Sequence, residues 1–475
     1  MPALTLSFEG AARTVTGSRH HLTWGEKSWL FDCGIYQGHR EDADRINRTF
    51  RFEPAEIDAV VLSHAHLDHS GNLPTLVNQG YPGAIHATPP TADLCRAMLA
   101  DSAFLMERDL EHLRKRDRDR ASRGNGEHRP REPLFTLDDV RATQGRFSTH
   151  GYHEPWDLAA GVTVEYFDAG HILGSALTTL EFRDGAKRFR LGMTGDLGRP
   201  RRPILRDPEV HPGVDALVLE STYGNRLHPP AEENERQLVE HVRRVAARGG
   251  RLIVPAFAVG RAQELVATLH ELMVKRAIPD LPVYVDSPLA SEATDVFRKH
   301  PEVFDEETRR SFTEHHGEPL GFKRLRYTRS PEESRALNDV GDPIIIIAAS
   351  GMCEGGRVLH HLRHGLGDPR NLVLFVGYQA EGTLGRRIVD GAEVVSIFGE
   401  PVRRRAEVQR LDGFSAHADQ AEILDWVGRL EPRPRRVFLV HGEFESAGVL
   451  AEKLEERFGL DVRVPALGEK VALWT

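Results

Sequence analysis

Residues 63–71 read Ser63-His-Ala-His-Leu-Asp-His-Ser-Gly71 and directly follow the apolar run Ile57-Asp-Ala-Val-Val-Leu62. That run predicts a short buried strand, so the polar cluster begins the loop at the end of the strand. The potential ligands in the cluster are His64, His66, Asp68 and His69. The first two are two positions apart, so an extended backbone directs both to one side, and the other two could face a second ion. Imidazole and carboxylate groups suit zinc or a similar transition metal, so the stretch predicts a metal centre.

Further ligands must come from elsewhere, because one segment cannot fill two coordination spheres. The candidates are His171 in Ala169-Gly-His-Ile-Leu-Gly-Ser175, Asp196 in Met193-Thr-Gly-Asp196, and His441 in Phe438-Leu-Val-His-Gly-Glu443. Each stands where an apolar stretch runs into a glycine, as expected for a ligand at the end of a strand. A lone histidine beside a glycine is more often structural, so the inference depends on the pattern formed by all of them.

The composition indicates a globular protein and excludes several classes. The chain has 475 residues, 40% of them hydrophobic, and a formal net charge of −9. No apolar stretch approaches the ~18–20 residues that a membrane span needs, and the first ten residues do not resemble a signal peptide. The three scattered cysteines, Cys33, Cys95 and Cys353, cannot form a disulfide framework, so we expect a cytoplasmic protein. The acidic balance excludes a polycationic nucleic-acid coat but permits a local binding groove.

Alternation of strands and helices begins near residue 213. The pattern predicts helices over 231–248 and 261–276, and apolar strands that include 252–255, 344–349 and 372–376. Such βαβ units are typical of a parallel sheet covered on both faces. A further helical segment carries His360, His361 and His364, which we expect to be surface or groove histidines because no carboxylate or third metal ligand is evident.

The motifs in this order resemble those of the metallo-β-lactamase superfamily, whose successive motifs match Asp32, the 63–71 cluster, His171 and Asp196. Three later segments resemble the additional motifs of its β-CASP nucleases: Leu219-Glu-Ser-Thr-Tyr-Gly224, Phe414-Ser-Ala-His-Ala-Asp419 and Leu439-Val-His-Gly-Glu443. That family includes the pre-mRNA cleavage-and-polyadenylation endonuclease and RNase J. The resemblance covers essentially the whole chain and implies an α/β fold. An αββα sandwich formed by residues 1–223 and 412–475 would be interrupted by a β-CASP domain, residues 224–411, with a Rossmann-like three-layer αβα architecture and a parallel sheet.

The resemblance also implies a role for each motif residue. The first zinc ion would be held by His64, His66 and His171, and the second by Asp68, His69 and His441. Asp196 would bridge the two ions together with a hydroxide that serves as the nucleophile. Asp68 would thus belong to the catalytic residues as well as to the ligands. His417 would act as the general acid that protonates the leaving 3′ oxygen, and Glu220 would orient the His417 ring and favour its protonated form.

The implied activity is hydrolysis of phosphodiester bonds in single-stranded RNA, in RNA processing or decay, by endonucleolytic or 5′-exonucleolytic cleavage. A small-molecule hydrolase of the same superfamily, acting on a thioester, lactone or lactam, is an alternative, but the αβ module between Tyr223 and Asp412 favours a polymer substrate. A DNA nuclease is another, although relatives that process DNA typically lack the last histidine, which this chain keeps as His441. A non-catalytic scaffold is disfavoured because every expected ligand position is filled.

Phosphate contacts are expected at three turns that link a strand to a helix start. Their candidates are Arg261, Ser350 and Arg357, because free backbone N–H groups at such turns bind anions. None of these turns carries a nucleotide-binding motif, so no nucleotide cofactor is expected. No membrane partner is expected either. No RNA-binding domain is expected before the hydrolase fold, so RNA targeting outside the cleft would need a homodimer or a partner protein.

Overall fold

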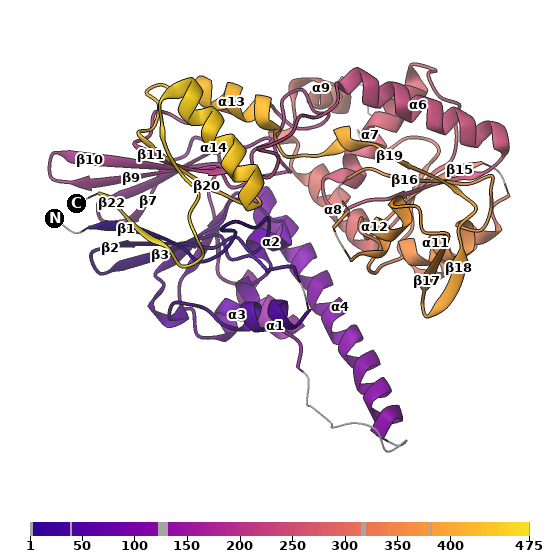
Figure 1. The fold of residues 1–475 in the computed structure, drawn as a ribbon, viewed down its shortest axis with the longest axis horizontal. Helices are drawn as coiled ribbons and strands as arrows, with labels where there is room; N and C mark the ends of the chain where they lie inside the picture. The colour runs from indigo at the N-terminus through magenta and orange to yellow at the C-terminus, as the bar shows by residue number, and fades with distance from the viewer. Residues whose placement is uncertain are drawn as a thin grey trace. The chain divides into compact units, whose positions relative to one another are not determined.

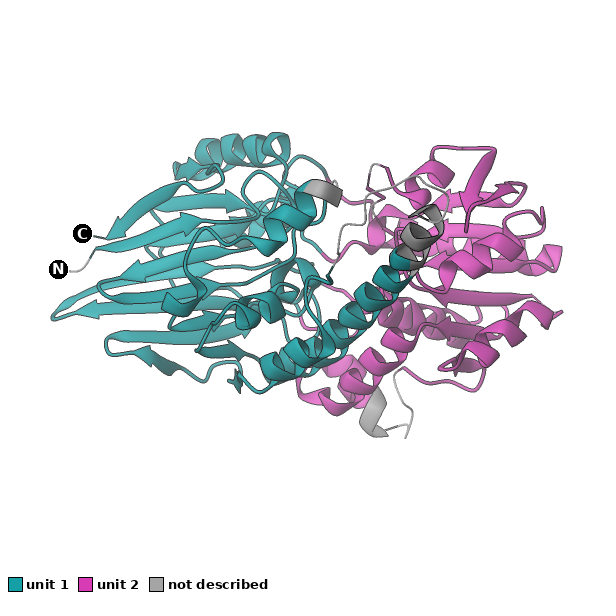
Figure 2. Ribbon diagram, turned by 90° about the horizontal axis from the view of Figure 1, so that it is seen from below, with its two compact units in different colours: residues 1–200, 207–226, 417–475 teal, residues 201–206, 227–416 magenta. Residues whose placement is uncertain are grey.

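The computed structural model describes residues 3–38, 40–121, 132–314, 320–341, 343–377, 379–380 and 382–474. The chain forms two compact units, coloured separately in Figure 2. Unit 1 comprises residues 1–200, 207–226 and 417–475, and unit 2 comprises residues 201–206 and 227–416. The chain therefore leaves unit 1 for six residues, returns to it, and leaves it again for the long insertion.

The first sheet of unit 1 has seven strands that come almost entirely from the beginning of the chain. In spatial order they are β22 (Lys470–Trp474), β1 (Leu4–Phe8), β2 (His20–Trp24), β3 (Lys27–Phe31), β4 (Ala59–Val61), β5 (Ala84–Ala87) and β6 (Phe147–Thr149). Strands β22 to β3 pair antiparallel, and β3 to β6 pair parallel. The C-terminal strand β22 thus closes the edge beside β1.

The second sheet of unit 1 also has seven strands. In spatial order they are β21 (Asp461–Arg463), β20 (Arg436–Val440), β11 (Ala216–Glu220), β10 (Lys187–Met193), β9 (Ala176–Asp184), β8 (Val162–Asp168) and β7 (Trp156–Ala159). The four strands from β21 to β10 are mutually parallel, and the remaining pairs are antiparallel. Strands β20 and β21 follow residues 227–416 of unit 2 in the sequence, so this sheet combines strands from both sides of the long insertion.

The two sheets pack face to face over one apolar core. Leu6 and Trp29 of the first sheet and Phe182 and Phe438 of the second are fully buried in that core. Outside the first sheet lie the helices of the first 150 residues (Figure 1): α1 (Arg40–Arg48), α2 (Leu67–Ser70), α3 (Leu73–Asn78), α4 (Pro89–Ala121) and α5 (Leu137–Gln144). Helices α13 (Gln420–Gly428) and α14 (Phe444–Phe458) pack on the second sheet through a separate apolar cluster that includes Trp426. The predicted αββα sandwich is confirmed.

Unit 2 is built on a six-stranded parallel sheet. Its strands, in spatial order, are β14 (Leu325–Tyr327), β13 (Val283–Asp286), β15 (Ile344–Ala348), β12 (Arg251–Pro255), β16 (Leu372–Phe375) and β19 (Glu407–Arg410). Every pair in this sheet is parallel. The central strands are buried on both faces, which explains their continuous apolar sequences. The parallel sheet expected from the βαβ pattern is confirmed.

Helices separate the strands of unit 2 along the chain. They are α6 (Ala231–Arg248), α7 (Arg261–Val274), α8 (Pro288–Lys299), α9 (Glu306–Glu314), α10 (Pro331–Ala336), α11 (Val358–Gly365) and α12 (Leu384–Val389). A small hairpin of β17 (Val394–Ile397) and β18 (Glu400–Arg403) precedes β19. Helix α6 has the predicted bounds, and it ends at Gly249, whose φ of +62° is accessible to glycine without strain. Among the residues that the structure describes, no helix is both long and apolar enough to cross a membrane.

Candidate metal centre

The candidate ligands come together because neighbouring parallel strands end at the same edge of a sheet. In the second sheet, β10, β11 and β20 are parallel neighbours, and they lead to Asp196, Glu220 and His441 respectively. In the first sheet, the parallel strands β3 and β4 lead to Asp32 and to the cluster that begins at His64. The fold therefore collects polar side chains from distant parts of the sequence at the edge of one sandwich.

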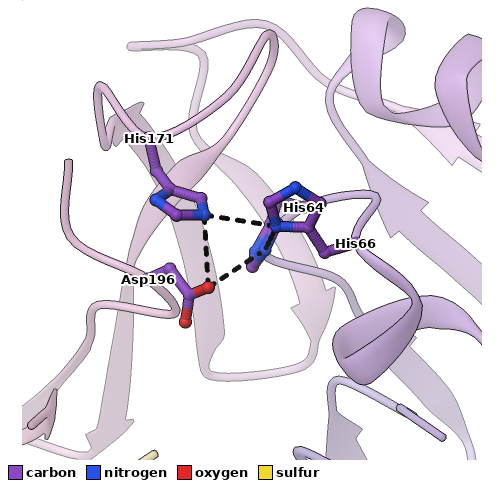
Figure 3. Close-up of side chains that lie close together, drawn as sticks. All are labelled: His64, His66, His171 and Asp196. Carbon is purple, nitrogen blue, oxygen red and sulfur yellow. Dashed lines mark hydrogen bonds and ion pairs between the residues drawn. The ribbon is translucent and has the colours of Figure 1, made fainter. Parts of the chain in front are cut away.

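Three imidazoles and one carboxylate form a compact group, shown in Figure 3. His66 Nδ1 lies 3.1 Å from His64 Nε2 and 3.2 Å from His171 Nε2. Asp196 Oδ2 lies 3.3 Å from His64 Nε2 and 3.3 Å from His171 Nε2. One ring proton on His66 Nδ1 cannot serve both neighbouring imidazoles, so hydrogen bonding alone does not account for this arrangement.

The spacing and chemistry of this group fit a zinc ion. Ligand atoms placed tetrahedrally at about 2.0–2.2 Å from Zn²⁺ would be about 3.3–3.6 Å apart. The four distances around His66 Nδ1 and Asp196 Oδ2 lie between 3.1 and 3.3 Å, close to that edge length. Imidazole nitrogens together with a carboxylate oxygen are a typical zinc donor set. The residues present therefore fit the metal that the sequence motif predicts.

A second group of candidate ligands meets the other oxygen of Asp196. His69 Nε2 lies 3.1 Å from Asp196 Oδ1, and His441 Nε2 lies 3.3 Å from Asp68 Oδ2. Both His69 Nε2 and Asp196 Oδ1 are buried, and neither has a hydrogen-bond partner among the described residues. The 3.1 Å between these two atoms is also close to the spacing expected of two ligands to one zinc ion. Asp196 thus presents Oδ2 to one group and Oδ1 to the other.

Burial keeps the imidazoles of the first group in the neutral form that metal coordination requires. It lowers the pKa of His64 to about 3 and of His66 to about 4, and it lowers the pKa of His171 as well. For Asp196 burial acts in the opposite direction, but the surrounding histidines, His441 and His69 foremost, outweigh it and lower the pKa of the carboxyl group. The first group therefore combines an ionised carboxylate with neutral nitrogen donors. In the second group, burial would lower the pKa of His69, but the carboxylates of Asp196 and Asp32 raise it well above its usual value.

Hydrogen bonds behind the ligands select the nitrogen that faces the centre. Asp32 Oδ2 accepts from His69 Nδ1 at 2.7 Å, which directs Nε2 of His69 towards Asp196. The Thr222 hydroxyl donates to the His441 carbonyl oxygen at 2.9 Å, so its lone pair accepts from His441 Nδ1 at 3.1 Å. Asp196 Oδ1 is farther from that nitrogen, at 3.5 Å. Such contacts set the tautomer of a ligating histidine and orient its ring.

The loops that carry the candidate ligands contain residues with positive φ angles and glycines in close contact with neighbouring backbone. Asp32 and His441 have φ values of +60° and +48°, in the left-handed region that side chains with a Cβ rarely adopt. Gly34 lies so close to the cluster that a Cβ there would stand 1.6 Å from the Asp68 carbonyl oxygen. A Cβ on Gly442 would stand 2.2 Å from Ser221 Oγ. These contacts explain the glycines that follow β3 and His441.

Beside the candidate ligands, the partly exposed imidazole of His417 pairs with the buried carboxylate of Glu220. His417 Nδ1 lies 3.0 Å from Glu220 Oε1, and Glu220 Oε1 also accepts from Leu197 N at 2.7 Å. His417 stands two residues before α13, whose first turn is fixed by a capping box between Asp419 and Glu422. Burial alone would lower the pKa of His417, but Glu220 and then Asp196 raise it to about 9.

The candidate phosphate contacts lie in unit 2, after neighbouring strands of its sheet. Arg261 begins α7 beyond β12 and forms an ion pair with Glu264. Ser350 follows β15, and its hydroxyl accepts from Glu354 N at 3.2 Å. Arg357 donates to the Asp286 carboxylate at 2.7 Å and to the Arg329 carbonyl oxygen at 2.8 Å. The turns are therefore where the sequence predicts them, and the guanidinium of Arg357 is partly engaged by the protein itself.

Some contacts differ from the sequence prediction or were missed by it. His361, expected as a surface or groove histidine, is buried and lies with Nε2 2.5 Å from Asp286 Oδ2, so that expectation is wrong for this residue. The supporting role of Thr222 was not predicted. In the sequence, only its position two residues after Glu220 indicated a role for Thr222. The contact itself could not be predicted, because its partner His441 is 219 positions away.

Family models match three parts of the chain. The metallo-β-lactamase superfamily matches residues 25–256, the β-CASP domain matches residues 262–388, and the Zn-dependent metallo-hydrolase RNA specificity domain matches residues 401–465. Together with the sandwich fold and the histidine–aspartate centre, these matches define a metallo-hydrolase of the metallo-β-lactamase class.

Relatives that match nearly the whole chain identify its family within that superfamily. The chain is 39% identical to "Ribonuclease TTHA0252" of Thermus thermophilus over 464 residues, which cover 97% of this chain and 98% of the relative. It is 33% identical to "Transcription termination factor FttA" of Methanosarcina mazei, over 98% of this chain and 71% of that relative. A crystal structure of a protein of unknown function from Enterococcus faecalis V583 shares the fold, with a TM-score of 0.56 at 14% identity over 99% of this chain and 100% of that one. The chain belongs to the β-CASP family of the metallo-β-lactamase superfamily.

The hydroxyl of Thr222 provides a test of the second ligand group. Thr222→Val removes the acceptor that fixes the tautomer of His441. We expect the variant to bind the zinc ion of that group about 10–100-fold more weakly, while binding at the His64, His66 and His171 group is unchanged. Competition titration with a zinc chelator measures both affinities. Thr222→Ser keeps the hydroxyl and serves as the matched control, and wild-type affinity at both sites in Thr222→Val would contradict the assigned role.

Proposed function

We propose that this chain is a zinc-dependent ribonuclease that hydrolyses phosphodiester bonds of single-stranded RNA and uses two Zn²⁺ ions per chain. The observation that carries the proposal is the shared carboxylate of Asp196, whose two oxygens face two separate groups of imidazole and carboxylate donors. A relative that is 39% identical over nearly the whole of both chains is named a ribonuclease, and the RNA specificity domain model covers residues 401–465.

The ligand roles follow the geometry of the two groups. In this proposal His64, His66 and His171 hold one ion, Asp68, His69 and His441 hold the other, and Asp196 lies between them. When bound, two zinc ions supply an activated water at neutral pH and offset the negative charge of the phosphate in the transition state. The protein contributes a preformed and largely buried donor set, so little reorganisation is needed on binding.

His417 is proposed as the general acid for the leaving 3′ oxygen. Its Nδ1 is bound to Glu220, so a proton delivered by His417 would come from Nε2. Burial opposes protonation of His417, but the carboxylates of Glu220 and Asp196 raise its pKa to about 9, which favours the protonated ring that a general acid requires. Glu220 acts as a positioning residue, since it holds the ring through the nitrogen that does not deliver the proton.

The remaining assignments are proposals of the same kind. The hydrolase domain is taken as residues 1–223 and 412–475, and the β-CASP domain as residues 224–411. Arg261, Ser350 and Arg357 are proposed to contribute to phosphate binding in the β-CASP domain. We also propose a cytoplasmic location, without a nucleotide cofactor or a membrane partner, and a homodimer or a partner protein as the source of additional RNA contacts.

Loss of one histidine ligand tests the proposed activity. His64→Ala removes a donor that lies 3.1 Å from His66 Nδ1 and 3.3 Å from Asp196 Oδ2. We expect it to reduce cleavage of end-labelled single-stranded RNA by more than about 100-fold, because loss of a ligand exceeds the effect of losing a supporting contact. Gel assays of cleavage, combined with metal analysis, measure the effect.

Controls separate this activity from the alternatives. His153→Ala removes an exposed histidine of the same unit whose ion pair is with Glu209 and not with any candidate ligand, and it should cleave RNA like the wild type. Single-stranded DNA, a lactam and a thioester are tested in parallel. RNA cleavage by His64→Ala at the wild-type rate would refute the metal-dependent mechanism. Turnover of the lactam or thioester without RNA cleavage would instead favour a small-molecule hydrolase, and preferential cleavage of DNA a DNA nuclease.

The pH dependence of cleavage tests the His417–Glu220 pair. A general acid must be protonated, so activity is retained below its pKa and lost as the pH rises through it. Glu220→Gln removes the carboxylate that does most to raise the pKa of His417. The alkaline limb of the rate profile should therefore move to lower pH in Glu220→Gln than in the wild type. An unchanged alkaline limb in a variant that retains its zinc would contradict the role of Glu220.

A further inference from the structure

An exposed aromatic side chain stands beside the metal-binding loop at 441. Phe444 is the first residue of α14, and 58% of its surface is exposed. It follows His441 by three positions, so the two Cα atoms can be at most about 11 Å apart. None of the structural contacts described above uses this ring, although it lies three residues after the candidate ligand His441.

A cation covers the Phe444 ring. The Arg13 guanidinium carbon lies 4.8 Å from the ring centroid, within the range of a cation–π interaction. Arg13 Nη2 also donates to the Val464 carbonyl oxygen at 3.1 Å, so two contacts hold the guanidinium over the ring. An exposed phenyl ring and an exposed guanidinium group therefore form a single amphipathic surface.

The segment that carries Arg13 is bonded to the metal-binding loop. His441 N donates to the Ala11 carbonyl oxygen at 2.7 Å. Ala11 and Arg13 have φ values of +47° and +61°, so two of three consecutive residues adopt a conformation that is unfavourable for side chains with a Cβ. Such strained residues persist only where the surrounding structure holds them, and they concentrate at functional sites. The Phe444–Arg13 pair is thus fixed to the same backbone that positions His441.

We propose that Phe444 and Arg13 form a stacking site for one nucleobase of the RNA substrate, next to the nucleotide whose phosphate is cleaved. This inference rests on the proposed ribonuclease function. Every base has an aromatic face that stacks on a phenyl ring, and a neighbouring guanidinium adds a cation–π interaction and a positive charge towards the phosphate backbone. The site would accept any base, so it contributes affinity and positioning rather than sequence selectivity.

The test combines a protein substitution with an abasic scan of the RNA. Single-stranded RNA carrying one abasic ribose at successive positions around the cleavage site is cleaved by the holoenzyme and by Phe444→Ala. We expect Phe444→Ala to raise KM by about five- to 150-fold, as loss of one stacked base would, with the zinc content unchanged. One abasic position should produce a similar loss in the wild type and no further loss in Phe444→Ala, because both changes remove the same contact.

Matched variants separate stacking from general apolar contact. Phe444→Trp should bind RNA at least as well as the wild type, and Phe444→Leu should resemble Phe444→Ala. Phe104→Ala is the control, since Phe104 is 48% exposed in the same unit and has Arg108 5.6 Å above its ring, but it lies on α4 outside the metal-binding loops. A wild-type KM in Phe444→Ala, equal losses in Phe444→Ala and Phe104→Ala, or strictly additive losses at every abasic position would overturn the stacking site. If the wild-type protein itself fails to cleave RNA, the proposed function fails; if only the stacking results fail, the ribonuclease proposal stands.

Discussion

The carboxylate of Asp196 imposes the main constraint on this structure. It is buried, it is ionised, and its two oxygens face nitrogen atoms of different histidines at 3.1–3.3 Å. A buried charge is strongly unfavourable unless it is paired. Burial lowers the pKa of His64 and His171, so these two imidazoles supply no formal positive charge, whereas neighbouring carboxylates raise the pKa of His69 and His417 against the effect of burial. Cations bound between the carboxylate and the imidazoles would pair the buried charge of Asp196 and would also occupy the neutral nitrogens of His64 and His171. The buried cluster of histidines and aspartates around Asp196 therefore has the properties of a cation-binding site.

The fold meets this constraint through the direction of its strands. Parallel pairing of β10, β11 and β20 brings Asp196, Glu220 and His441 to one edge, although residues 227–416 of unit 2 separate the last two in the sequence. The edge is complete only when the end of the chain has added β20 to the second sheet. Hydrogen bonds of Asp32 and Thr222 with the Nδ1 atoms of His69 and His441 leave the Nε2 atoms of both rings to serve as the proposed ligands. In the proposed centre, His441 becomes available as a ligand only when β20 has joined the second sheet.

Local patterns predicted much of this architecture. The apolar period identified α6 with its observed bounds, and the spacing of histidines and aspartates in 63–71 indicated the centre. Strand order and pairs that are distant in the sequence could not be predicted in this way. The Thr222–His441 contact and the burial of His361 against Asp286 depend on which strands are neighbours, information that no local period contains. The same reason explains why the partners of Arg357 could not be anticipated: a turn at a strand end predicts a location, but not the other side chains that meet there.

Anomalous diffraction at the zinc absorption edge, measured on crystals of the zinc-loaded protein, tests the central claim most directly. The shared carboxylate predicts two peaks about 3.5–4 Å apart. One should lie among His64, His66 and His171, the other among Asp68, His69 and His441, and an oxygen of Asp196 should contact each. A single peak, or zinc bound away from Asp196, would contradict the account.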